Sequence, residues 1–229
     1  MKSCFPSISE GGNELYDVAR RIATVGYYVL LPDLYHRQGK VRHAFYDEKG
    51  KMISLVTLSD ELRAKVRAPL MKTSDAMVME DTGALLEWIG RGEPVRPGAM
   101  GCIGYCLGGR MVFRACGTYP ERFRAGASLH GTMLATDAQD SPHLTAARCK
   151  GELYCGYAEK DPNATPAVMN AVAAAMRGSA TDYRPQLHKG AEHGYALPDR
   201  DIFDRDAANR DWERIFAMFH RQMGPWVPK

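Results

Sequence analysis

The sequence predicts a doubly wound α/β fold, in which a mainly parallel sheet is covered by helices on both faces. Short apolar runs with the composition of buried strands alternate with longer segments whose apolar residues repeat at helical spacing. Strands separated by helices pair in parallel, and the connecting helices then cover both faces of the sheet. No Ser/Gly-rich or charge-rich linker divides the 229 residues, so we expect a single domain over residues 1–229.

Five short runs rich in β-branched, aromatic and other apolar residues are predicted to form strands. The first of them, GYYVLL, stops at Pro32. A shorter run at residues 2–6 is a sixth candidate at the start of the chain. The five main candidates are residues 26–31, 99–105, 125–129, 152–157 and 183–188.

Four segments place their apolar residues on one helical face, namely residues 15–22, 77–88, 168–176 and 208–219. The third of them is followed by Gly178, a typical residue for ending a helix. Residues 36–74 do not fit the alternation, because they are polar and only weakly periodic. A connection of this length is either a functional excursion such as a lid or contains a small hairpin and helix, and the two interpretations are compatible.

Composition excludes several classes of protein. The formal net charge of +3 is small, and neither zinc-type spacing nor interleaved basic and aromatic residues are present, so we expect no nucleic-acid partner. The six cysteines are scattered, as in reduced intracellular proteins. The chain opens without a signal-type apolar region and contains no run of about 18 apolar residues. We therefore expect a cytoplasmic protein with no membrane partner.

The stretch GYCLG, residues 104–108, places Cys106 between glycines, directly after a predicted strand and before a predicted helix. This is the pattern of the nucleophile elbow of α/β hydrolases, with cysteine in the position of serine. The helix N-terminus also favours a thiolate at Cys106. The alternative is a purely structural role, as a buried cysteine beside a glycine-rich turn. A phosphate-binding turn is less favoured, because no Lys-Ser/Thr pair follows the glycines.

In this fold an acid and a histidine follow the nucleophile in chain order. His193 lies between a strand and a glycine, where a loop at the carboxyl end of the sheet presents a base. Asp161 follows the preceding strand by a short loop, although on its own it could equally cap a helix. Cys106 would then be the nucleophile, with backbone amides of Leu107 and Ile8 holding the oxyanion.

These residues resemble the dienelactone hydrolase (carboxymethylenebutenolidase-like) family over nearly the whole chain. The resemblance rests on ELYDVARRIATVGYYVLLPDLYHR, GCIGYCLGG, AEKDPNATP and AEHGYALPDR followed by a tryptophan. It implies an α/β-hydrolase fold, a Cys106–Asp161–His193 triad and neither a metal nor an organic cofactor. It also implies that the chain begins inside a strand and lacks the first strands of the family's sheet.

The chain departs from the family's lactone-cleaving members at two positions. Those members have a glutamate in the loop after the first nucleophile-facing strand, where this chain has Ser7. They also have an arginine four residues beyond the histidine, which binds the substrate carboxylate, where this chain has Leu197. His130, after the next strand, could line the site or simply pack. We expect a monomer or homodimer that hydrolyses a small ester or lactone through an acyl-enzyme. The alternative is a non-catalytic domain that binds a small molecule or a partner.

Overall fold

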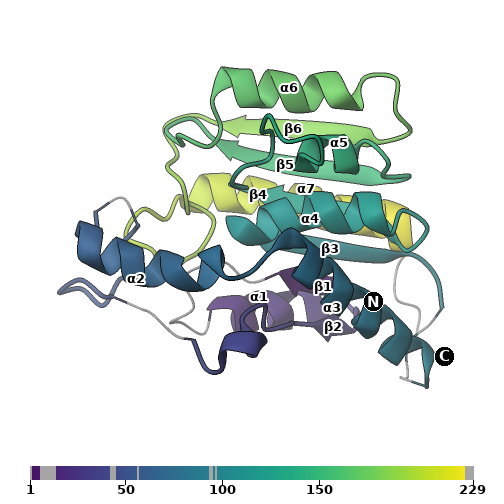
Figure 1. The fold of residues 1–229 in the computed structure, drawn as a ribbon, viewed down its shortest axis with the longest axis horizontal. Helices are drawn as coiled ribbons and strands as arrows, with labels where there is room; N and C mark the ends of the chain where they lie inside the picture. Colours follow the sequence, from purple (N-terminus) through teal and green to yellow (C-terminus); the bar gives the residue numbers. More distant parts are fainter. Residues whose placement is uncertain are drawn as a thin grey trace.

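A six-stranded sheet with every strand parallel organises the fold (Figure 1). The computed structural model describes residues 2–5, 14–41, 45–55, 57–92, 95 and 97–224, the first four as backbone only. The strand order is β2-β1-β3-β4-β5-β6. The strands are β1 (Lys2–Phe5), β2 (Val29–Leu30), β3 (Met100–Tyr105), β4 (Phe123–Leu129), β5 (Glu152–Ala158) and β6 (Asp182–His188). This order confirms the predicted doubly wound parallel sheet.

Helices cover both faces of this sheet and bury two apolar layers. The helices are α1 (Glu14–Ala23), α2 (Asp60–Met71), α3 (Asp75–Gly90), α4 (Leu107–Thr118), α5 (Pro142–Ala146), α6 (Pro166–Met176) and α7 (Arg205–Met223). Helices α1 and α7 pack on one face, and α2 to α6 contribute to the layer on the other face (Figure 1). Alternate residues of β5 serve the two layers, since Leu153 and Cys155 pack in one and Tyr154 in the other.

The predicted elements differ from the observed ones mainly at the sheet edge. The run at residues 26–31 forms only the two-residue strand β2, which lies at the edge and pairs with β1 alone. Tyr27 instead donates a hydrogen bond from its hydroxyl to the carbonyl of Gly224, at the end of α7. A short edge strand leaves few unpaired backbone groups exposed. The other four runs form strands within two residues of the predicted bounds.

The irregular segment 36–74 contains a short 3-10 helix (His36–Gln38), an isolated antiparallel bridge between Tyr46 and Met52, and α2. Met52 also forms a parallel bridge with Arg200, so this excursion is joined to the loop that follows β6. Figure 1 shows α2 on the side of the molecule to which the strand arrows point. The excursion therefore lies at the edge of the sheet where sites are expected in this class of fold.

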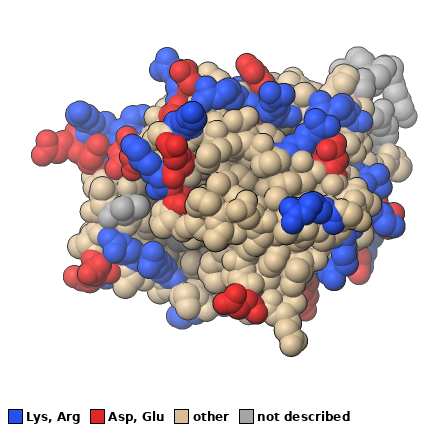
Figure 2. Space-filling model, turned by 90° about the horizontal axis from the view of Figure 1, so that it is seen from above, with Lys and Arg blue, Asp and Glu red and all other residues tan. Residues whose placement is uncertain are grey.

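Charge on the face shown in Figure 2 is mixed, with basic and acidic side chains intermingled around an uncharged central region. No helix in the described ranges combines the length and the apolar character needed to cross a membrane.

Candidate active site

Cys106 occupies a strained turn between β3 and α4. Its backbone has φ 54° and ψ −114°, a combination that non-glycine residues rarely adopt. Glycines make this turn sterically feasible: a Cβ at Gly104 would lie 2.9 Å from the amide nitrogen of Gly109 and overlap the carbonyl of Gly108. A Cβ at Gly109 would lie 2.8 Å from the Cα of Gly131. The glycine cluster thus allows strand and helix to approach closely while the thiol is held at the turn.

Asp161 and His193 are brought together by the loops that follow β5 and β6. His193 Nδ1 lies 2.6 Å from Asp161 Oδ2, and the Asp161 residue is only 4% exposed. The other carboxylate oxygen accepts hydrogen bonds from the backbone and side-chain nitrogens of Asn163 at 2.8 and 3.0 Å. The two loops are joined by the amide of Lys160, which donates to the carbonyl of Ala191. The Asp161 carboxylate is therefore fixed in a position where it orients the imidazole.

The Cys106 thiol and the His193 imidazole interact closely enough to shift each other's protonation. Burial raises the pKa of the thiol, but the charge and hydrogen bond of His193, helped by the Leu107 amide, outweigh burial and lower this pKa below its ordinary value. Burial lowers the pKa of His193, whereas the Cys106 thiolate and the Asp161 carboxylate raise it to about 10. Both directions favour a thiolate–imidazolium pair at neutral pH.

Leu107 is fully buried at the start of α4, and its backbone N–H donates towards the Cys106 sulfur. An amide in this position is available to an oxyanion formed on a substrate bound to the same sulfur. The second predicted donor, Ile8, lies outside the described residues, as do Ser7 and the neighbouring Glu10.

Arg200 and Glu14 are two buried ionisable residues that the sequence analysis missed; they interact electrostatically with each other, and Arg200 also acts on Cys106. Arg200 is 7% exposed, and its Nε has no hydrogen-bond partner in the described part of the chain. Its positive charge helps to lower the pKa of Cys106. Burial raises the pKa of Glu14 to about 7, opposed by Arg200 and reinforced by Asp199. Arg200 ends the sequence PDR and lies seven residues beyond His193, which is a signal that the sequence does contain. The sequence does not show, however, which residues of this loop point towards Cys106.

The excursion at residues 45–55 holds the Arg200 loop in place. The amide of Met52 donates to the carbonyl of Asp199, and the amide of Asp201 donates back to the carbonyl of Met52. The Asp201 carboxylate accepts from the amide of Ser54 at 3.1 Å. These contacts connect segments separated by about 150 residues on either side of Arg200. They show how the irregular connection contributes to the surroundings of Cys106.

His130 follows β4 and is 2% exposed. Its ring lies edge-on to that of His193, with centroids 4.9 Å apart, and also contacts Tyr195 at 5.5 Å. Its backbone has φ 37°, and its amide donates to the carbonyl of Gly156. Of the two roles open to His130 in the sequence, this position places it beside the imidazole of the candidate site.

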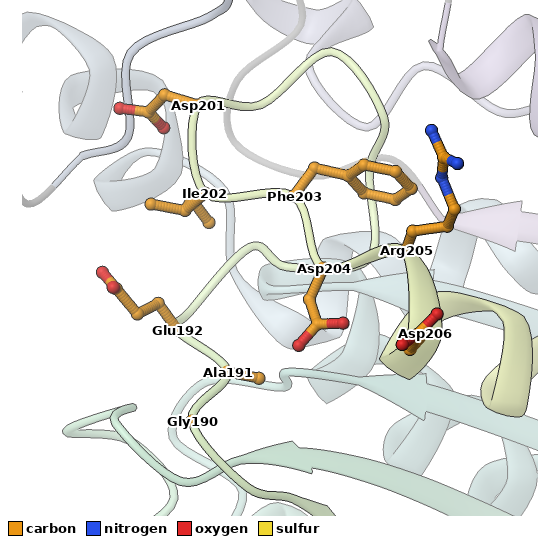
Figure 3. A pocket seen from close by; sticks show the side chains of 9 residues that line it. All are labelled: Gly190, Ala191, Glu192, Asp201, Ile202, Phe203, Asp204, Arg205 and Asp206. Atoms are coloured by element: carbon orange, nitrogen blue, oxygen red, sulfur yellow. The ribbon is translucent and has the colours of Figure 1, made fainter.

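A cavity of about 470 Å³ lies between the start of the loop after β6 and the segment that leads into α7 (Figure 3). It is lined by residues 190–192 and 201–206, so none of Cys106, Asp161 or His193 borders it. Two of its carboxylates already accept backbone hydrogen bonds, Asp201 from Ser54 and Asp204 from Ala207 at the start of α7. This acidic cavity is therefore distinct from the group of residues around Cys106.

Comparison with known proteins identifies related sequences and structures. The sequence model of the dienelactone hydrolase family matches residues 10–223. A Synechocystis protein named "Putative carboxymethylenebutenolidase" is 23% identical over 92% of this chain and 81% of its own length. A protein of the same name from Methylorubrum extorquens is 26% identical over 91% of this chain and 67% of its own length. The crystal structure of a "Putative Dienelactone Hydrolase" from Klebsiella pneumoniae superposes with a TM-score of 0.76 at 21% identity, covering 96% of this chain and 86% of that one.

Proposed function

The chain belongs to the dienelactone hydrolase family, and we propose that it hydrolyses a small ester or lactone through an acyl-enzyme on Cys106. One observation carries the proposal. A buried carboxylate, Asp161, orients His193, and that imidazole in turn lowers the pKa of a thiol held on a strained turn. A nucleophile, a base and a group that orients the base are the parts that acyl transfer requires.

In the first half of the reaction the Cys106 thiolate attacks the carbonyl carbon of the substrate. The electron pair of the C=O bond moves to oxygen, and the Leu107 amide donates a hydrogen bond to that oxyanion. When the intermediate collapses, the carbon–oxygen bond to the leaving group breaks. The departing alkoxide takes the proton from His193 Nε2, and a thioester remains on Cys106.

In the second half, His193 acts as the base. It accepts a proton from a water molecule whose oxygen attacks the thioester carbon. The carbon–sulfur bond then breaks, the electron pair returns to Cys106, and the carboxylic acid is released. Asp161 is hydrogen-bonded to His193 and stabilises the imidazolium of the resting pair, which forms again when the water molecule gives up its proton in the second half.

The surroundings of Cys106 favour substrates that carry negative charge. Leu197, which stands where lactone-cleaving members have an arginine, is 1% exposed and packs in the apolar layer with α1 and α7. Arg200 supplies a guanidinium near the nucleophile from a position three residues further along. A carboxylate on the substrate would pair with this guanidinium in a largely desolvated setting.

Steady-state turnover of p-nitrophenyl acetate tests the proposal. The wild type should release p-nitrophenolate catalytically, and Cys106→Ala should lose at least about 1,000-fold in kcat, because removing the nucleophile leaves only binding and oxyanion stabilisation. Cys102→Ala is the matched control, since Cys102 is also a buried cysteine but lies on β3 with its sulfur 3.6 Å from that of Cys116 on α4. Absence of Cys106-dependent turnover across a panel of small esters and lactones would favour a non-catalytic binding domain.

A further inference from the structure

We propose that His130 is a further catalytic residue, which holds the water molecule that attacks the acyl-enzyme. This inference rests on the proposed function, because it concerns the second half of the same reaction. The observation behind it is a buried polar side chain next to His193 whose ring nitrogens have no hydrogen-bond partner among the described residues.

Neither ring nitrogen of His130 has a hydrogen-bond partner among the residues that the structure describes. Buried polar groups in folded proteins are nearly always paired, with protein, water or ligand. A histidine that served only to fill space would leave two buried polar atoms unsatisfied, at a cost of about 1–3 kcal/mol each. A water molecule bound to the ring would give one of these nitrogens a partner.

The position of His130 fits the path of the attacking water. The loop after β4 places it between Cys106, at the end of β3, and Asp161, beyond the end of β5. Its ring contacts the His193 ring at 4.9 Å between centroids. Because His193 Nδ1 is bound to Asp161, the proton of the water must go to Nε2. In the proposed step, one water molecule is bound by both imidazoles.

The chemistry requires His130 to be neutral, since an imidazolium has no lone pair with which to accept a hydrogen bond. Burial lowers the pKa of His130 well below 6.5, and the positive charges of His193 and Arg200 lower it further. The neutral ring accepts one O–H of the water while the other O–H points to His193. The water oxygen forms the new bond to carbon, its proton passes to His193 Nε2, and the C–S bond breaks with its electron pair returning to Cys106.

The backbone conformation of His130 favours a role that depends on where its ring is held, rather than on packing alone. Its φ of 37° lies in the left-handed region, which is costly for a non-glycine residue. The amide is fixed by its 2.8 Å hydrogen bond to the carbonyl of Gly156 on β5. The ring is thus held at one place beside His193 by backbone geometry and by its contacts with Tyr195 and Tyr105.

The test separates acylation from deacylation in His130→Phe, which keeps a planar ring but removes both nitrogens. Rapid-quench measurements with p-nitrophenyl acetate give the two rates, and intact mass spectrometry gives the fraction acetylated. Acylation should stay within about threefold of wild type and deacylation should fall about tenfold or more, the size of one lost hydrogen bond. Acetylated protein should accumulate, and added hydroxylamine, a strong nucleophile, should release the acetyl group rapidly.

His188→Phe is the matched control. His188 is another fully buried histidine with an unpartnered ring nitrogen among the described residues, but its Nε2 pairs with Asp211 at 2.7 Å. This variant should keep the wild-type ratio of deacylation to acylation. An equal fall of both rates in His130→Phe, as expected if the ring only packs His193, would overturn the inference, and so would an unchanged deacylation rate.

If His130→Phe fails to fold, His130→Asn gives the same reading, because asparagine suits a left-handed backbone. Its shorter amide should lower the ratio of deacylation to acylation by at least about threefold, and an unchanged ratio would overturn the inference. A wild type that shows no Cys106-dependent acetylation at all would instead contradict the proposed function.

Discussion

Replacing His193 with alanine should convert Cys106 from a thiolate at neutral pH into an ordinary buried thiol. In the wild type, burial of Cys106 is outweighed by the charge and hydrogen bond of His193, so the thiol pKa is lowered. In His193→Ala the largest opposing influence is gone and burial remains. The pKa of Cys106 should then return to its ordinary 9.0 or rise above it.

The size of the effect follows from ionisation. At pH 7 a thiol with a pKa of 9.0 is about 1% ionised, so the loss in thiolate population can reach about 100-fold, the limit for a fully ionised wild-type thiol. The thiolate of the variant is more basic and therefore intrinsically more reactive. This higher reactivity offsets roughly half of the loss in alkylation rate on a logarithmic scale. Alkylation of Cys106 at pH 7 should therefore slow about tenfold. Above about pH 9 the order of the two rates should reverse.

Iodoacetamide labelling, read by peptide mass spectrometry between pH 6 and pH 10, measures these rates. Wild-type labelling of Cys106 should change little between pH 7 and pH 9, because the pKa of His193 is raised to about 10 and the ion pair persists. The buried Cys116, Cys149 and Cys155, whose thiol pKa values are raised, should label slowly. His143→Ala, a partly exposed histidine on α5, serves as the control. Parallel pH profiles for wild type and His193→Ala would show that His193 does not lower the pKa of Cys106.

Three further perturbations have defined outcomes. Gly104→Ala should lower the free energy of unfolding by about 3 kcal/mol or more in urea titrations, because its Cβ would overlap the backbone carbonyl of Gly108. Glu14→Gln should raise the free energy of unfolding in urea above pH 7 by at most about 3 kcal/mol. The pKa of the Glu14 carboxyl is raised to about 7 in the folded protein, so wild-type stability is lost as the pH rises from 4.5 through 7. Below pH 4.5 the difference in unfolding free energy between variant and wild type should vanish. Arg200→Met should reduce kcat/KM about tenfold for a carboxylated ester, while a neutral ester of the same size should change less than about threefold.

Much of the fold could be predicted from sequence because local patterns and the global topology agree. The run at residues 99–105 is apolar throughout, and β3 is indeed buried along its whole length at the centre of the sheet. The edge strand β2 was predicted too long, since composition does not reveal how far an edge is paired. Helix α5, only five residues long, has too little periodicity to be recognised.

The candidate site could be predicted in part for a similar reason. Cys106, Asp161 and His193 each follow a strand, and parallel strands bring their carboxyl ends to one edge of the sheet. Arg200 could not be placed, because its position depends on backbone pairing between its loop and Met52, which lies about 150 residues earlier. Ile8 stays a prediction, since it lies outside the described residues.

The acyl-enzyme on Cys106 can be detected by intact and peptide mass spectrometry of protein quenched in acid during turnover of p-nitrophenyl acetate. We expect an acetyl group on the peptide containing Cys106, formed and lost at rates that match turnover, and absent from Cys106→Ala. Asp161→Asn and His193→Ala should slow its formation, because they disturb the base that the thiol interacts with. Catalytic turnover that proceeds undiminished in Cys106→Ala, or an acetyl group that accumulates on another residue at the rate of turnover, would show that Cys106 is not the nucleophile.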